Sequence, residues 1–161
     1  MEKLSIFQKP IRIAIAGASG GIGGALCELC QQSDQVETIY ALSRQPVVGN
    51  KIQHFTLDYN NLESLENLAN IESIDILVIA SPTPEHHKNI LEAIKYPIKS
   101  IFCEKPLSIN SKLSNEIIKL CDKNNIVLAV NYMRRWDNIY HECKKKLFSG
   151  DLGKLNSIVA Y

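Results

Sequence analysis

The sequence predicts an α/β fold in which helices cover both faces of a doubly wound parallel sheet. Short apolar runs alternate along the chain with stretches of helical apolar periodicity, the pattern of strands joined by crossover helices. The run at residues 74–80 is almost wholly apolar, which is typical of a strand buried on both faces. A cluster of glycines follows the first run and precedes the first helical stretch. Together these features favour a complete sheet of parallel strands with crossover helices.

The individual elements follow from the same periodicities. Strands are expected at the short apolar runs, residues 11–16, 36–42, 52–57, 74–80, 98–103 and 126–130. Helices are expected from the glycines to about residue 33, at 60–70, from Pro84 through Ile94 and at 111–124.

The last part of the chain does not fit into this sheet. Residues 132–161 are predicted to hold one more helix, ending near Gly150, and then an apolar strand at 155–161. We therefore divide the chain into a domain at 1–131 and the start of a second domain at 132–161. An unpaired strand at 155–161 predicts self-association, so a homo-oligomer is the expected assembly.

Composition excludes several classes of function. The chain has 161 residues and 45% hydrophobic content, enough to bury a core, and 18 basic against 17 acidic side chains leave no surplus for a nucleic acid. No apolar run reaches the roughly 18 residues of a membrane span, and the first residues do not look like a signal peptide. An odd count of five cysteines favours a reducing compartment, so the expected location is cytoplasmic. The histidine and cysteine spacings predict no metal site.

The first helix contains a Cys-x-x-Cys sequence, Cys27 and Cys30. These cysteines lie within the apolar pattern and away from a helix start, where thiolates are activated, so we interpret them as core residues rather than a redox pair. The helix is expected to bury a stripe made of Ile22, Ala25, Leu26 and Leu29.

The glycine cluster predicts a phosphate-binding loop. Residues 17–24 read GASGGIGG and lie where a strand ends and a helix begins, so backbone N–H groups there can hold the pyrophosphate of a dinucleotide. A flexible turn is the alternative, because a lone glycine motif is weak evidence. The spacing G-x-x-x-G-x-G looks like that of the short-chain dehydrogenase/reductase family. The candidate cofactor-binding residues in this loop are Gly17, Ser19, Gly20, Gly21 and Ile22.

Two further positions bear on the adenosine end of such a cofactor. Ser43 and Arg44 follow the second strand, where many NAD sites have an acidic residue for the ribose 2′-hydroxyl. A cation and a hydroxyl favour a 2′-phosphate, so NADP(H) is preferred and NAD(H) is the alternative; a solvated arginine is the other interpretation of Arg44. Asp58 resembles the adenine-contacting aspartate of short-chain enzymes, although a carboxylate at a helix start explains it nearly as well.

Three motifs in the second half each follow a strand. They begin with residues 79–87, IASPTPEHH, and continue with 103–107, CEKPL, and 131–137, NYMRRWD. In this order they resemble the glucose-fructose oxidoreductase/inositol dehydrogenase (Gfo/Idh/MocA) family, from about residue 74 onward. All three fall at carboxyl ends of strands, the edge at which open parallel sheets bind ligands.

The resemblance implies an NAD(P)-binding Rossmann domain followed by the truncated start of an α+β substrate domain. It implies hydride transfer between the nicotinamide and a sugar or cyclitol carbon, with Lys105 as the catalytic lysine and the Lys105–Pro106 bond in the cis form. A desolvated lysine titrates low enough to help proton transfer. A second catalytic group would lie beyond Tyr161. By the same resemblance, the cofactor-binding residues here are Ala80, Ser81, Pro82, Thr83, His86, Glu104, Lys105 and Arg135.

Alternatives remain for these assignments. Glu104 and Lys105 can be a surface ion pair, and His86 can be a surface residue of a helix start. Tyr140 and Lys144 have the Tyr-x-x-x-Lys spacing of a short-chain reductase, but the serine and the Asn-Ala-Gly of that family are missing. The chain can also be a fusion of two families, or a dinucleotide-binding module without catalysis.

Overall fold

The computed structural model describes residues 8–57, 71, 73–154, 156–157 and 159. The chain forms two compact units, residues 1–131 and residues 132–161. The expected helix at 60–70 and the candidate residue Asp58 lie outside the described residues.

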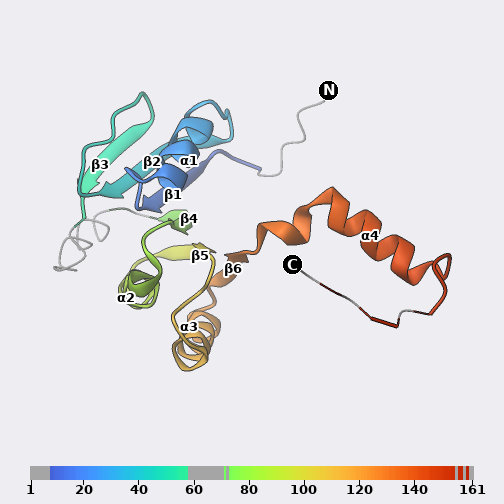
Figure 1. Cartoon of the computed structure of the whole chain (residues 1–161). Helices are drawn as coiled ribbons and strands as arrows, with labels where there is room; N and C mark the ends of the chain where they lie inside the picture. The colour runs from blue at the N-terminus through green and yellow to red at the C-terminus, as the bar shows by residue number, and fades with distance from the viewer. Residues whose placement is uncertain (1–7, 58–70, 72, 155, 158, 160–161) are drawn as a thin grey trace. The chain divides into compact units, whose positions relative to one another are not determined.

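The first unit is built on a sheet of six parallel strands in the order β3-β2-β1-β4-β5-β6 (Figure 1). This order runs outward in both directions from the neighbouring strands β1 and β4, so the sheet is doubly wound, as the sequence predicts. A crevice outside the carboxyl ends of β1 and β4 is the position where such sheets bind ligands. The strands are β1 (Ile11–Ala16), β2 (Val36–Ser43), β3 (Ile52–Thr56), β4 (Ile74–Ile79), β5 (Ile98–Glu104) and β6 (Val127–Asn131).

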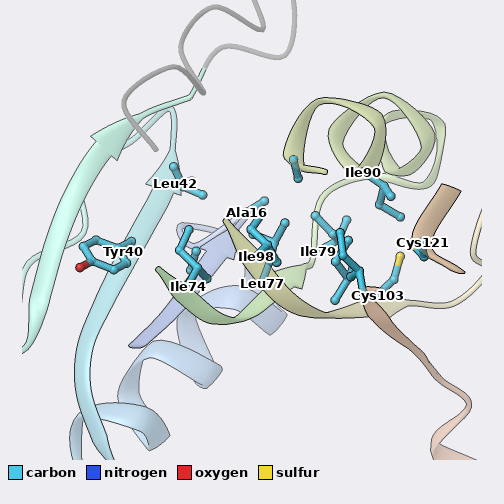
Figure 2. Close-up of a cluster of buried hydrophobic side chains, with 14 of the residues drawn as sticks. Ala16, Tyr40, Leu42, Ile74, Leu77, Ile79, Ile90, Ile98, Cys103 and Cys121 are labelled. Carbon is cyan, nitrogen blue, oxygen red and sulfur yellow. The ribbon is translucent and has the colours of Figure 1, made fainter. Parts of the chain in front are cut away.

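Helices lie on both faces of this sheet. Helix α1 (Gly21–Gln31) packs against one face through Cys27, while α2 (Thr83–Ala93) and α3 (Ser111–Lys123) pack against the other. Figure 2 shows Ile90 of α2 and Cys121 of α3 beside Ile79 and Cys103 of the sheet. Alternate residues of the central strands enter the two clusters, so these strands are buried on both sides, as their continuous apolar sequences indicate.

The apolar stripe expected on α1 is wrong in part. Ile22 is 53% exposed and Leu29 is 65% exposed, whereas Gly23 and Cys27 are buried and Leu26 is partly buried. The physical reason is the close approach of the helix to the glycine loop: a Cβ atom on Gly23 would collide with the backbone carbonyl of Gly17. Gly23 therefore faces the loop in the first turn, while Ile22 and Ala25 are exposed and Leu26 packs against the core from the next turn.

The second unit holds a short 3-10 helix at Met133–Trp136 and the helix α4 (Asn138–Phe148). The carboxylate of Asp137 caps α4 by accepting a hydrogen bond of 2.8 Å from the backbone N–H of Ile139. The predicted helix before Gly150 is therefore confirmed. The strand expected at 155–161 is not seen at Asn156, Ser157 and Val159, the residues described there, and the structure offers no neighbouring strand among the described residues of this unit to pair with it.

Two properties of the described residues bear on function. None of the described helices is long and apolar enough to cross a bilayer. Nor do the described histidine, cysteine and carboxylate side chains form a group of three that could hold a metal ion.

Candidate cofactor-binding site

The glycine loop is fixed over the carboxyl ends of three strands. The backbone N–H of Gly17 donates to the carbonyl of Leu42 at the end of β2, over 2.9 Å. Gly17 has a φ of 90°, a conformation that side chains disfavour, and a Cβ atom there would lie 2.6 Å from the carbonyl oxygen of Ala80, after β4. Glycine at position 17 therefore allows the loop to pass directly over β4.

The first turn of α1 opens toward solvent at this loop. Gly20 is the N-cap residue and provides no side-chain oxygen for the N–H groups of the first turn. A Cβ atom at Gly21 would meet nothing within 4 Å, and both Gly20 and Gly21 are exposed, as is Ser19. Uncapped N–H groups at the positive end of a helix form a suitable site for a phosphate.

Ser43 and Arg44 lie at the carboxyl end of β2, one strand away from the glycine loop. The hydroxyl of Ser43 is buried and donates to the carbonyl of Gln45 over 2.7 Å, so its proton is already used within the loop. The Nε2 of His54 donates to the Ser43 carbonyl over 3.1 Å, which fixes this strand end further. Arg44 is exposed, so of the two residues its side chain is the one open to a ligand.

Hydrogen bonds to β1 and to α2 fix the loop after β4. The backbone N–H of Ala80 donates to the Ala16 carbonyl over 2.8 Å, which continues the pairing of β4 with β1. Ser81 is buried, and its Oγ accepts a hydrogen bond of 2.9 Å from Nδ2 of Asn89 on α2. Pro82 is exposed and Thr83 is half-buried at the start of α2, where Pro84 stands in the first turn as predicted.

Glu104 and Lys105 follow β5. The Oε1 of Glu104 accepts a hydrogen bond of 2.7 Å from Nδ2 of Asn131 at the end of β6, and among the described ion pairs none joins Glu104 to Lys105. The Lys105–Pro106 peptide bond is cis. Lys105 is exposed, so the desolvation expected around it is not supplied by the described residues.

His86 lies inside the fold rather than on its surface. It is 1% exposed, so the interpretation as a surface residue is wrong, and its ring nitrogens face two backbone carbonyls. These are Ser81 O, 2.8 Å from Nε2, and Pro106 O, 2.9 Å from Nδ1. His87 instead points its Nε2 toward Glu116 of α3, at 3.1 Å. His86 thus contacts both the loop after β4 and the loop after β5.

All five cysteines are free thiols. Cys27, Cys103 and Cys121 are buried in the core, Cys30 is half-buried, and Cys143 is exposed. Burial raises the pKa of the Cys27 thiol to about 11 and that of Cys103 to about 12. Thiols with such values stay protonated at neutral pH, which agrees with interpreting Cys27 and Cys30 as structural residues.

Comparison with known proteins identifies the family. The model of the Gfo/Idh/MocA oxidoreductase family, with an NAD-binding Rossmann fold, matches residues 11–132. The chain belongs to this family. Because the Gfo/Idh/MocA match includes the glycine loop as well as the three later motifs, one family accounts for both halves of the first unit, and the fusion alternative is not needed.

Individual Gfo/Idh/MocA relatives support this assignment. The chain is 36% identical over 84 residues to inositol 2-dehydrogenase of Rhodococcus erythropolis, an alignment covering 52% of this chain and 24% of that protein. It is 25% identical over 100 residues to an NADP(+) scyllo-inositol 2-dehydrogenase of Bacillus subtilis, covering 62% of this chain and 28% of that one. The crystal structure of myo-inositol 2-dehydrogenase from Lactobacillus plantarum superposes with a TM-score of 0.67 at 27% identity, covering 91% and 43% of the two chains. The chain therefore spans less than half the length of these Gfo/Idh/MocA relatives.

The second unit carries the remaining candidates. Arg135, Tyr140 and Lys144 are exposed and line a hollow of about 620 Å³ within this unit. The hydroxyl of Tyr140 accepts a hydrogen bond from Arg134, whose guanidinium lies 5.7 Å from the centre of the Tyr140 ring. Tyr140 and Lys144 are thus two positions one turn apart on α4, and the Gfo/Idh/MocA match leaves the short-chain reductase interpretation without support.

Proposed function

We propose that this chain binds a nicotinamide dinucleotide along the carboxyl edge of its sheet and serves an oxidoreductase that acts on the CH–OH group of a cyclitol or sugar. One observation carries the proposal. The uncapped start of α1 at Gly20 and Gly21, the Ser81 loop and the Glu104–Lys105 loop follow β1, β4 and β5, three adjacent strands of the sheet. Adjacent parallel strands end at the same edge, so one extended ligand can contact all three loops.

The chemistry of each loop suggests how the dinucleotide is oriented. The N–H groups of Gly21 and Ile22, in the exposed first turn of α1, are suited to the pyrophosphate. The Ser81 loop, with Pro82 and Thr83, then lies toward the nicotinamide ribose, and Arg44 lies toward the adenosine ribose. When bound, the cofactor supplies or accepts the hydride, and the protein orients it.

We propose that NADP(H) is preferred over NAD(H), with Arg44 as the deciding residue. An exposed guanidinium forms paired hydrogen bonds with a phosphate, and Ser43 and Gln45, the sequence neighbours of Arg44, carry no carboxylate to repel it. Among the relatives, a scyllo-inositol 2-dehydrogenase is named for NADP(+), whereas the family as a whole is described as NAD-binding.

The proposed catalytic residue is Lys105. Lys105 is the residue after Glu104, whose carboxylate is held by Asn131, and we place it at the nicotinamide end of the proposed site. An ammonium at this point can donate a hydrogen bond to the substrate oxygen and exchange its proton as the hydride moves. The names of the relatives, inositol dehydrogenases, suggest a cyclitol or a sugar as the substrate, and the free thiols suit a cytoplasmic location.

The test measures turnover and cofactor binding side by side. The chain is incubated with NADP⁺ and with myo-inositol, scyllo-inositol or glucose, and formation of reduced nicotinamide is followed by its absorbance. Lys105→Ala should abolish turnover and leave NADPH binding within about twofold, and Lys112→Ala, an exposed lysine of α3, should change neither. Binding without turnover would restrict the chain to a cofactor-binding role, and absence of both would overturn the proposal.

A further inference from the structure

His86 links the two loops that flank the nicotinamide end of the proposed site. It stands in the first turns of α2 and is 1% exposed. Its Nε2 lies 2.8 Å from the carbonyl oxygen of Ser81, and its Nδ1 lies 2.9 Å from that of Pro106. The first loop follows β4 and the second follows β5, so a single ring connects two strand ends.

The chemistry of the two contacts determines what the ring must do. A backbone carbonyl can only accept a hydrogen bond, and a neutral imidazole carries one N–H. The N–H of the ring therefore donates to one of the two loop carbonyls, and the ring as a whole packs between both of them.

The neighbouring thiol is consistent with this arrangement. Cys103 Sγ lies 3.5 Å from Nδ1 of His86, and the thiol donates its own proton to the Glu104 carbonyl over 3.3 Å. The sulfur therefore packs against the Nδ1 edge of the ring. Glu85, beside His86 on α2, forms an ion pair with Lys88 at 3.7 Å, and Glu104 is bound by Asn131.

We propose that His86 is a positioning residue whose ring bridges the carbonyls of Ser81 and Pro106 and so fixes the Lys105 loop against the Ser81 loop. The identity of the ligand rests on the proposed function; the bridge itself does not. The consequence is specific to one end of the cofactor. The glycine loop is held by other bonds, to Leu42 and within itself, so loss of the His86 bridge should weaken contacts with nicotinamide and leave those with the rest of the dinucleotide unchanged.

The experiment compares NADPH with 2′-phospho-ADP, which lacks both the nicotinamide and its ribose, by titration calorimetry. His86→Leu fills the space and donates nothing, so it should lower NADPH affinity about tenfold while affinity for 2′-phospho-ADP stays the same. His86→Asn retains a donor near the Nδ1 position and His86→Gln one near Nε2, so each should fall between wild type and His86→Leu. His87→Leu is the matched control, because His87 faces Glu116 and not the loops.

The possible results separate the inference from the proposed function. Wild-type chain that binds neither ligand would overturn the proposed function. Binding of both, with the same affinity ratio in wild type and in every His86 variant that folds, would overturn the inference.

Discussion

The side-chain amide of Asn131 donates a hydrogen bond of 2.7 Å to the carboxylate of Glu104. The two residues are directly paired across β5 and β6, at the carboxyl end of both strands. The bond fixes the carboxylate of the residue before Lys105 and ties the edge strand β6, which has β5 as its neighbour in the sheet, to the proposed site. Asn131 thus contacts the Glu104–Lys105 loop through Glu104, and His86 contacts it through the Pro106 carbonyl.

Replacing this amide with a carboxylate should weaken the site in a pH-dependent way. In Asn131→Asp two carboxylates face each other, and like charges at this distance disfavour the state in which both are ionised. We expect lower thermal stability and weaker NADPH binding at neutral pH, with partial recovery as pH falls and the pair takes up a proton. Asn124→Asp, at the exposed end of α3, is the control. Equal behaviour of Asn131→Asp at neutral and acidic pH would argue against the pairing.

The glycines at positions 17 and 21 should respond in opposite ways to alanine. Gly17→Ala forces a side chain into a φ of 90° and against the Ala80 carbonyl, so it should reduce the free energy of unfolding by about 1–3 kcal/mol. Gly21→Ala meets nothing within 4 Å and should leave stability unchanged or slightly raised, while its methyl group hinders a phosphate at the start of α1. Thermal melts and NADPH titrations of the two variants measure both effects. A destabilised Gly21→Ala would contradict the geometry of the loop.

Arg44 should decide between the two dinucleotides. Loss of a hydrogen-bonded charge pair with the 2′-phosphate should weaken NADPH binding by about tenfold or more in Arg44→Ala. NADH lacks that phosphate, so its affinity should not change. Lys119→Ala, an exposed lysine of α3, controls for the loss of one positive charge. Equal loss of NADPH and NADH affinity would show that Arg44 does not contact the 2′-phosphate.

The buried thiol of Cys103 should make the protein less stable in alkali. Its pKa is raised from the ordinary value of 9.0 to about 12, chiefly by burial and then by Glu104. Because the folded-state pKa is the higher one, the thiol contributes stability that is complete below pH 9 and is lost as pH rises toward 12. Denaturant melts of wild type and Cys103→Ala across this range measure the difference, which should shrink as pH rises. A constant difference would contradict the shift.

Thiol reactivity provides a second check on the buried cysteines. At neutral pH, iodoacetamide should modify the exposed Cys143 first and leave Cys27 and Cys103 unmodified while the protein is folded. Peptide mass spectrometry identifies the order. Early modification of Cys103 would show that the interior of the sheet is more accessible than its burial indicates.

Much of the fold follows directly from the sequence, because each strand is a short apolar run and each turn after it is marked by glycine, proline or polar residues. All six strands of the sheet agree with their expected positions to within a residue or two. The orientation of α1 was harder to predict, since Ile22 and Leu29 have the right spacing for a buried stripe. Periodicity does not show how closely a helix approaches a neighbouring backbone, and in α1 that approach leaves Gly23 and Cys27 as the fully buried residues.

The sequence predicts which loops form the candidate site, but it does not predict the hydrogen bonds that hold these loops in place. The motifs place Ser81, Glu104 and Lys105 at strand ends, and these positions are confirmed. The roles of Asn89 and Asn131, which hold Ser81 and Glu104, depend on which residues become neighbours in space. His86 is the clearest case: a histidine at a helix start has the pattern of a surface residue, and only the three-dimensional structure brings two carbonyls to its ring.

The most direct test of the account is a titration of the purified chain with NADPH and NADH, followed by nicotinamide fluorescence. Saturable binding of one NADPH per chain, tighter than binding of NADH and weakened in Gly21→Ala and Arg44→Ala, is the predicted result. Absence of saturable binding for both nucleotides, with the chain folded by circular dichroism, would contradict the assignment of the carboxyl edge of this sheet as a dinucleotide site.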